Sequence, residues 1–152
     1  MKLSTKGRYG LRALIDLALY SENEAASIAS ISARQQISES YLEQLIAKLR
    51  KAGLVVSVRG AGGGYRLAKP ASEITVGDIL RALEGSLDAV HCPGLEEEGS
   101  CEGSEFCVTK YVWQRINESI NRTVDEIRLD QLIEESRKMK DEAGTVGACC
   151  IN

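Results

Sequence analysis

The sequence predicts a mainly α-helical domain that carries one small β-hairpin and ends in a long helix. Three observations predict this fold class. Apolar residues recur with helical spacing in several segments, a glycine-rich turn separates two short strand-like runs, and 152 residues suffice for about one domain. Hydrophobic residues make up 43% and charged residues 27% of the chain, which excludes collagen-like and wholly disordered classes.

The N-terminal third of the chain predicts three helices. Ser4 or Thr5 can cap the first, the second starts near Ser27, and Ser38 can cap the third, which ends near Gly53. Two short helices across a tight turn form a helix-turn-helix candidate. Apolar stripes with i, i+3, i+4, i+7 spacing support the first helix (Leu11, Leu14, Ile15 and Ala18) and the third (Leu42, Leu45, Ile46 and Leu49).

The outward side chains of the third helix suit contacts with DNA. A major groove admits a helix, and there Ser donates or accepts a hydrogen bond, Gln pairs with adenine and Glu accepts from cytosine. The alternative is an ordinary solvated helix face. These outward positions hold Glu39, Ser40, Tyr41, Glu43, Gln44 and Lys48.

A hairpin follows, with a strand over residues 54–58, a turn over 59–64 and a return strand over 65–67. Arg59 and Arg66 flank the glycine-rich turn, which could approach a phosphate backbone or a minor groove. A plain flexible hairpin tip is the alternative. A nucleotide-binding loop is disfavoured, because a strand and not a helix follows the glycines.

The two halves of the chain carry opposite net charges. Residues 1–70 hold 11 basic and 5 acidic side chains, a net charge of +6, whereas residues 71–152 hold 8 and 17, a net charge of −9. A basic front half on an acidic chain indicates a polyanionic partner for that half alone. Chance clustering on a solvated surface is the alternative.

Helix, helix-turn-helix and two-stranded wing, in this order, form a winged helix-turn-helix. The runs 3–10, 37–45, 49–55 and 57–67 resemble the IscR-type regulators, small dimeric bacterial transcription factors, and the similarity extends from residue 2 to about residue 130. The resemblance implies double-stranded DNA as the partner, with Arg59 in the minor groove. The DNA-binding residues expected on this basis are Ser38, Ser40, Tyr41, Glu43, Gln44, Arg59, Gly60 and Arg66.

Beyond the wing, residues 75–85 predict a further capped helix. The composition then changes, because few apolar residues lie between His91 and Cys107 and core burial cannot order that segment. It holds Cys92, Cys101 and Cys107 with the spacing C-x8-C-x5-C. Disulfides are disfavoured in the cytosol, so the thiols indicate metal or cluster ligands or a redox switch. Unrelated free cysteines are the alternative.

The spacing leaves zinc and iron–sulfur clusters both open, since thiolates bind both. The resemblance implies the cluster, because IscR-type regulators carry three cysteines here that bind one. We expect Cys92, Cys101 and Cys107 to hold it, and a [2Fe–2S] rather than a [4Fe–4S] cluster.

A fourth ligand cannot be carried over from the family. The histidine that completes the ligand set in IscR-like proteins is replaced by Lys110. Related nitric-oxide sensors use an aspartate of the first helix, and this region of the present sequence has Arg8 and Arg12 instead. The one histidine, His91, is adjacent to Cys92, which makes simultaneous ligation geometrically awkward and favours a structural surface role. The remaining candidates are an external thiol or one of Glu96, Glu97, Glu98, Glu105, Cys149 and Cys150.

An apolar stripe predicts a helix of about twenty residues from Val108, ~30 Å long at ~1.5 Å per residue. This is too long to bury against so small a domain, which favours a two-fold dimer and a near-palindromic operator. A helix folded back on its own domain is the alternative. The stripe comprises Val112, Ile116, Ile120, Val124 and Ile127.

These features predict four regions: a winged helix-turn-helix (1–85), a cluster loop (86–107), a dimerisation helix (108–133) and a flexible tail (134–152). We expect a transcriptional regulator, a repressor, that senses cluster, redox or iron status. The alternative is a zinc-stapled or cluster-free winged-helix regulator or interaction module with redox-active cysteines. With one histidine and no paired acid–base site, the chain is not expected to be an enzyme. Without a signal peptide or bilayer-spanning run, it is expected in the cytoplasm, away from membranes.

Overall fold

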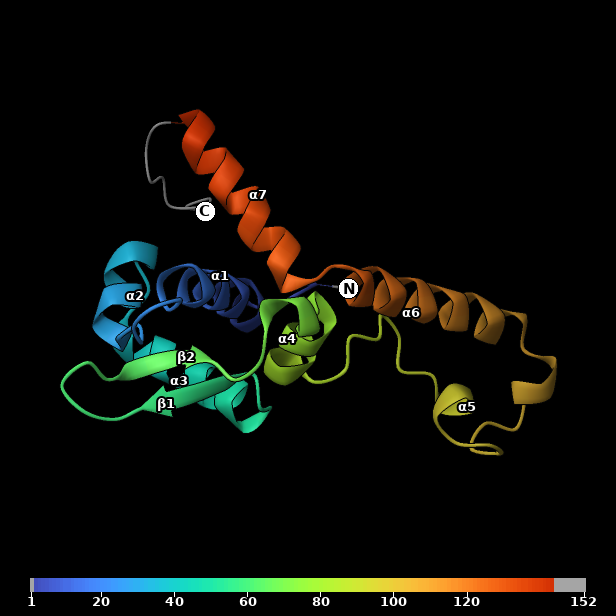
Figure 1. Ribbon diagram of the computed structural model, residues 1–152. Coiled ribbons are helices and arrows are strands. Elements are labelled where there is room, and N and C mark those ends of the chain that lie inside the picture. The colour runs from blue at the N-terminus through green and yellow to red at the C-terminus, as the bar shows by residue number, and fades with distance from the viewer. Residues whose placement is uncertain (1, 144–152) are drawn as a thin grey trace.

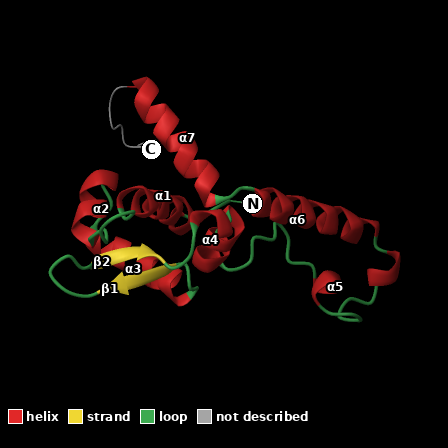
Figure 2. Cartoon of the chain, viewed as in Figure 1, coloured by secondary structure: helices red, strands yellow, loops and turns green. Residues whose placement is uncertain are grey.

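A computed structural model describes residues 2–143. A compact body of four helices and a hairpin carries a long helical arm on one side, and a last helix projects from the body (Figures 1 and 2). The elements are α1 (Thr5–Tyr20), α2 (Ile28–Gln35), α3 (Glu39–Lys51), β1 (Val55–Val58), β2 (Gly64–Leu67), η1 (Ala71–Glu73), α4 (Val76–Glu84), α5 (Pro93–Glu96), η2 (Ser104–Phe106), α6 (Val108–Glu126) and α7 (Leu129–Ala143).

Side-chain caps fix where the helices of the body begin. Ser4, Ser27 and Ser38 each accept a hydrogen bond from a backbone amide in the first turn of α1, α2 and α3. Thr75 and Asp78 form a reciprocal capping box at the start of α4. These helix starts agree with those expected from the sequence.

The wing is a two-stranded antiparallel hairpin in which Val55 pairs with Leu67. Ala26, just before α2, extends it by exchanging backbone hydrogen bonds of 2.9 and 2.8 Å with Tyr65. A Cβ at Gly64 would lie 2.4 Å from the Ala26 carbonyl oxygen, so this close approach requires glycine. The hairpin is therefore anchored, through the start of β2, to the residues that lead into α2.

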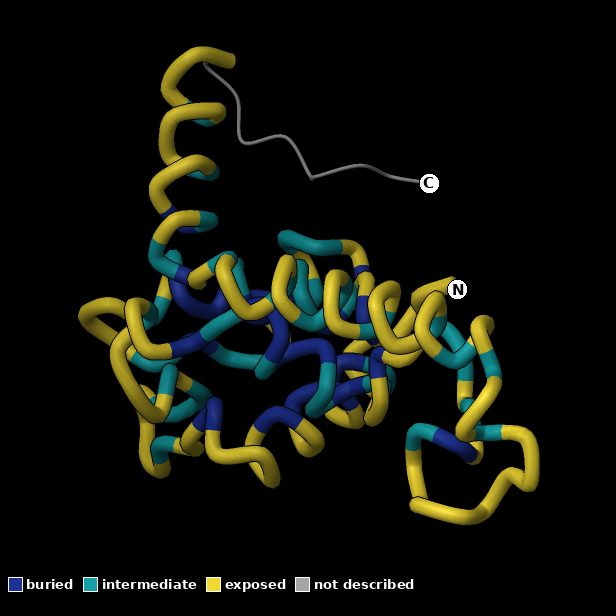
Figure 3. Tube along the Cα trace, turned by 90° about the vertical axis from the view of Figure 1, so that its right-hand side faces the viewer, coloured by how far each residue is buried: buried dark blue, intermediate teal, exposed yellow. Residues whose placement is uncertain are grey.

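The core lies between α1, α2, α3 and α4, and the buried residues concentrate there (Figure 3). A second, smaller cluster joins Val76, Leu80 and Leu87 to Ile120 and Val124. The C-terminal half of α6 thus packs on α4 of its own domain. The N-terminal half of α6 extends beyond the body and remains exposed.

The chain leaves α6 at Ile127 to pair briefly with the residues before α4. Val76 donates its amide to the Ile127 carbonyl oxygen at 2.8 Å, and Leu129 donates to that of Ile74 at 2.8 Å. Helix α7 then begins and buries Leu129 and Ile133 in the main core. The tail expected from residue 134 begins within this helix, because residues 134–143 continue α7. None of the helices in residues 2–143 has the length and apolar character needed to cross a membrane.

Candidate nucleic-acid interface and metal centre

The outward face of α3 presents the side chains expected to read DNA. Ser40, Glu43 and Gln44 are exposed, and the hydroxyl of Ser38 caps the helix by accepting from the Tyr41 amide at 3.3 Å. The opposite face of α3 buries Leu42, Leu45, Ile46 and Leu49 in the core, which holds the exposed face outward.

Tyr41 differs from its neighbours because it is half-buried. Its ring meets that of Tyr9 edge-on, with 6.1 Å between centroids, and its hydroxyl donates to the Thr5 hydroxyl at 3.3 Å. Tyr41 therefore joins the start of α3 to the first turns of α1.

The hairpin lies alongside α3, and its tip projects from the body (Figure 1). Leu54 donates its amide to the Leu49 carbonyl oxygen at 3.0 Å, which ties the base of the wing to the end of α3. Arg59, Gly60 and Arg66 are exposed on it. Gly60 has φ +109°, a conformation that few residues other than glycine adopt. The structure thus brings every expected DNA-binding residue onto α3 or the adjacent wing.

A buried ionic network sets the position of the helix-turn-helix. Asp16 is 2% exposed in α1 and accepts from Arg34 at 2.7 Å and from Gln35 at 2.9 Å. The hydrogen bond to Asp16 raises the pKa of Arg34. Arg12 donates to the Gln35 carbonyl oxygen at 2.9 Å, at the end of α2. This network was not predicted from the sequence; the signal for it is one carboxylate among the apolar positions of α1.

The three cysteines lie on separate parts of the loop between α4 and α6. Cys92 precedes α5, Cys101 is exposed between α5 and η2, and Cys107 precedes α6. Within residues 2–143, no three His, Cys, Asp or Glu side chains are grouped so that they could hold a metal ion. The three thiols are free, and as soft donors they fit a cluster or zinc chemically.

Cys107 has the environment of a reactive thiol. Its Sγ lies 3.0 Å from the Thr109 hydroxyl, and this contact, aided by the Lys110 amide and charge, lowers the pKa of the thiol. The N-terminus of α6 also favours negative charge at this place. The thiolate, which is the form that binds metal, is therefore favoured at Cys107.

Lys110, at the position of the family's histidine, and two candidates for a fourth ligand, His91 and Glu96, have other polar partners. The ammonium of Lys110 donates to the Ser104 hydroxyl at 3.3 Å. His91 is exposed, with Nδ1 3.2 Å from Oε1 of Glu96. Cys149 and Cys150 lie outside the described residues.

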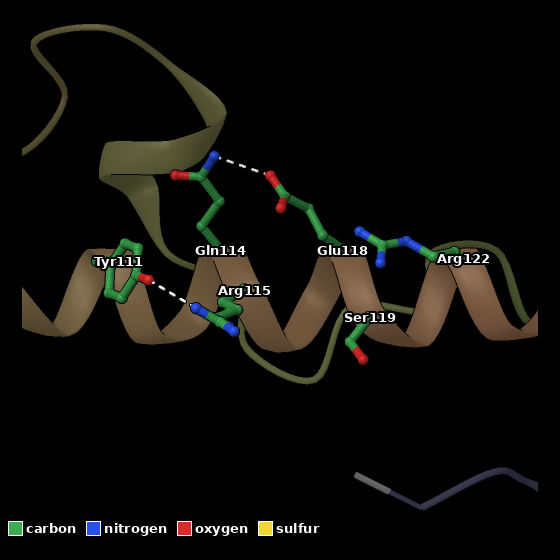
Figure 4. Close-up of a pocket in the computed structure, with 6 residues that line it drawn as sticks. All are labelled: Tyr111, Gln114, Arg115, Glu118, Ser119 and Arg122. Atoms are coloured by element: carbon green, nitrogen blue, oxygen red, sulfur yellow. Dashed lines mark hydrogen bonds between the residues drawn. The ribbon is translucent and has the colours of Figure 1, made fainter.

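Two grooves border α6. Figure 4 shows the first, a polar face where Gln114 donates to Glu118 at 2.8 Å and Arg115 donates to the Tyr111 hydroxyl at 2.8 Å. The second lies between α5 and α6 and is lined by Asp88, Gly94, Leu95, Glu98, Lys110, Gln114, Asn117, Glu118 and Asn121. Neither lining includes a cysteine, so neither groove by itself marks the cluster site.

Comparisons with known proteins agree with this architecture. Residues 3–135 match the model of the Rrf2 family, described as an iron-dependent transcriptional regulator. The HTH-type transcriptional regulator IscR of Vibrio atlanticus is 45% identical over 92% of this chain and 79% of its own, and that of Klebsiella pneumoniae is 44% identical over 95% and 86%.

Solved structures show the same fold. T. potens IscR is 46% identical with a TM-score of 0.73 and covers 92% of this chain and 91% of its own. CymR, the global cysteine regulator of B. subtilis, is 41% identical with a TM-score of 0.72 and covers 89% and 98%.

Proposed function

This chain belongs to the Rrf2 family of transcriptional regulators, and on that premise we propose that it is a homodimeric repressor whose DNA affinity is set by an iron–sulfur cluster. It is a DNA-binding regulator and not an enzyme. The proposal adds the cluster, its ligands, the dimer and a near-palindromic operator. With DNA as the target, it also implies action in the cytoplasm.

The observation that carries the proposal is the attachment of a three-thiol loop to the arm of the DNA-binding domain. Cys107 directly precedes α6, and α6 packs on α4 within that domain. An event that orders the loop therefore acts on a helix in contact with the DNA-binding unit. This supports sensing by the loop and reading of DNA by α3 and the wing.

Cys92, Cys101 and Cys107 would hold the group, and a bound cluster supplies a redox-active and iron-dependent centre. Because the thiols lie on separate parts of the loop, holding one group requires the loop to close. Ligand gain and DNA affinity can be coupled only if the two loop states differ in affinity for DNA, and the coupling is then reciprocal. A [2Fe–2S] cluster is our expectation for its type.

The second copy is supported by the exposed apolar side chains at the free end of α6. Val108 is 78% exposed, Val112 41% and Ile116 38%. They continue, at four-residue steps, the row that Ile120 and Val124 bury on α4. A two-fold axis along this row would bury it and set two α3 helices about one DNA turn apart.

The test is oxygen-free purification followed by iron and sulfide analysis and Mössbauer spectroscopy. Duplexes of ~30 base pairs, long enough for two half-sites, are selected from a randomised pool by loaded and by cluster-free protein in turn. Titrations of both forms on these selected duplexes then measure the affinity ratio.

We expect brown protein with iron and sulfide in equal amounts and different affinities for the two forms. Colourless, zinc-containing protein would overturn the cluster and support the zinc-stapled alternative. Equal affinities on every selected duplex would overturn the sensing mechanism while leaving DNA binding intact. Cys101→Ala should lose the iron without losing the fold.

A further inference from the structure

The entrance to the cysteine loop is hydrogen-bonded to α6 through the side chain of Asn117. Its Oδ1 accepts from the Ala89 amide at 2.9 Å, and its Nδ2 donates to the Val90 carbonyl oxygen at 3.3 Å. Ala89 and Val90 stand just before His91 and Cys92. Since Cys107 is joined to the N-terminus of α6 through the chain, both ends of the loop are set by this helix.

The same face of α6 holds α4, one and two turns further along. Arg81 of α4 donates to Oδ1 of Asn121 at 2.7 Å and grips both carboxylate oxygens of Asp125 at 2.7 and 2.9 Å. Asn121 also donates to the Asn117 carbonyl oxygen at 2.9 Å. Asn117, Asn121 and Asp125, spaced four residues apart, thus form a continuous row that we call the polar strip.

Beyond Arg81, the end of α4 contacts the DNA-binding elements. Lys48 of α3 donates to the Leu83 carbonyl oxygen at 3.4 Å. Glu84 accepts from the amides of Ser4 and Gly7 in α1 at 2.9 and 3.0 Å. A continuous series of contacts therefore leads from the start of the cysteine loop to α3, in a molecule whose wing and loop lie at opposite ends (Figure 1).

The polar strip is poorly explained as a device for stability alone. The side chains of Arg81 and Asp125 are 36% and 47% exposed, and ion pairs this exposed contribute little to the free energy of unfolding. The adjacent apolar row, with Ile120 and Val124, already holds α6 on the body. The polar strip adds geometric specificity. Its bidentate and amide hydrogen bonds are directional and fix the position of α6 along α4, which apolar contacts alone do not specify.

We propose that Asn117, Asn121 and Asp125 are positioning residues that couple the cysteine loop to the DNA-binding unit through Arg81. This inference rests on the proposed function, since it concerns how the state of the loop alters DNA affinity. Asn117 holds the Cys92 side of the loop in register with Cys107, and Asn121 and Asp125 transmit the position of α6 to α4.

Two readouts test it, one of which needs no cluster. The first is amide hydrogen exchange at Ala89 in cluster-free protein, which reports the bond to Asn117 directly. The second is the ratio of affinities of loaded and cluster-free protein for the selected duplexes. Variants are Asn117→Ala, Asn117→Asp, which keeps an oxygen for the Ala89 amide, and Arg81→Ala. Gln114→Ala is the matched control. It removes a side-chain amide from the same helix, but one that bonds to Glu118 within α6 and not to the cysteine loop.

We expect Asn117→Ala to speed exchange at Ala89 by about tenfold or more and to bring the affinity ratio close to one. Asn117→Asp should restore protection at Ala89. Arg81→Ala should reduce the affinity ratio without changing exchange at Ala89. It removes the hydrogen bonds between α4 and α6 but leaves the bond between Asn117 and Ala89 in place. The Gln114→Ala control should leave both readouts at wild-type values, and the affinity of cluster-free protein should change less than about twofold in every variant.

Slow exchange at Ala89 in Asn117→Ala would overturn the role of this side chain. An unchanged affinity ratio in both Asn117→Ala and Arg81→Ala would overturn the coupling. If the wild-type protein itself shows a ratio of one, the proposed function fails instead, and the exchange measurement still decides whether Asn117 fastens the loop.

Discussion

At the scale of single residues, Glu84 illustrates how one carboxylate organises a helix start from a distance. It lies at the end of α4, yet its Oε1 accepts from the amide and hydroxyl of Ser4 and from the Gly7 amide. These donors belong to the first turn of α1, where backbone amides lack helical partners. Burial alone would raise the pKa of Glu84, but the hydrogen bonds from Ser4 and Gly7 outweigh it and lower the pKa.

Glu84→Gln should therefore destabilise the protein at neutral pH, by about 1 kcal/mol, because a charge-assisted cap becomes neutral. The lowered pKa fixes the sign of the pH dependence. The stabilisation is complete above the unfolded value near 4.5 and is lost as pH falls through the lower folded value. Urea unfolding at pH 7 and at about pH 3.5 measures it, and the gap between wild type and variant should close in acid.

The control is Glu118→Gln, an exposed glutamate bonded to Gln114 within α6. It should change the free energy of unfolding little at either pH. A gap between wild type and Glu84→Gln that stays constant from neutral to acidic pH would show that the charge of Glu84 is not the stabilising feature.

The second residue-scale prediction concerns the wing. Arg59→Ala should weaken binding to the selected duplexes by about 1–3 kcal/mol, the range of a specific base contact. Arg137→Ala removes the same charge from α7, where the side chain pairs with Glu22 away from the proposed interface. It should change affinity far less, as measured by fluorescence titration at fixed salt. Similar losses in the two variants would mean that DNA does not dock on the wing.

At the scale of elements, the packing of α1 on α4 depends on the absence of a side chain. A Cβ at Gly10 would lie 2.2 Å from Cδ1 of the buried Leu83. Gly10→Ala gains about 1 kcal/mol of helix propensity but overpacks the contact at a cost of about 1–3 kcal/mol. We expect net destabilisation by chemical denaturation. Leu83→Ala should cost less in the Gly10→Ala background than in wild type, because it makes room for the new methyl group.

Gly62→Ala is the matched control for this prediction. Gly62 lies at the wing tip, where an added Cβ meets nothing within 4 Å. The free energy of unfolding of the Gly62→Ala protein should therefore not fall below that of the wild type. If the costs of Gly10→Ala and Leu83→Ala simply add, the two residues are not in the tight contact described here.

The elements differ in how far the sequence could predict them. Helices α1, α3 and α4 carry their own caps and apolar stripes, so local patterns were enough to find them. The part of α7 from residue 134 onward was assigned to a flexible tail because charged residues dominate its pattern, and the start of the helix was hidden because Leu129 is buried by a distant part of the chain. The break after α6 has the same origin, since Val76 pairs with Ile127 across fifty residues of sequence.

The features of the candidate site also differ in whether the sequence could predict them. The exposed polar face of α3, the wing arginines and the cysteine spacing are visible as residue types at given intervals. The network around Asp16 and the polar strip around Asn117 are not, because each joins side chains from elements that are distant in sequence. The sequence therefore predicts which residues would contact DNA or a metal, and the structure adds which residues hold those candidates in place.

At the scale of the whole molecule, the cysteine loop and the wing lie at opposite ends of the fold (Figure 1). Helix α6 is the element that reaches from the body to the loop. Its outer apolar row, with Val108, Val112 and Ile116, is exposed in the single chain. Together with the near-palindromic operator that we propose, an exposed apolar row of this kind favours a second copy of the same helix as its partner.

Ile116→Glu should therefore separate the proposed dimer, because a charge would be buried without a partner at the inner end of the shared row. Sedimentation equilibrium should then give the mass of one chain, 16.5 kDa, where the wild type gives twice that value. Affinity for a two-half-site duplex should fall by about a hundredfold or more, because each chain then binds one half-site alone. Met139→Glu alters an apolar side chain on α7 that is 61% exposed and should leave mass and affinity unchanged. A dimeric Ile116→Glu protein, or a monomeric Met139→Glu protein, would move the interface away from α6.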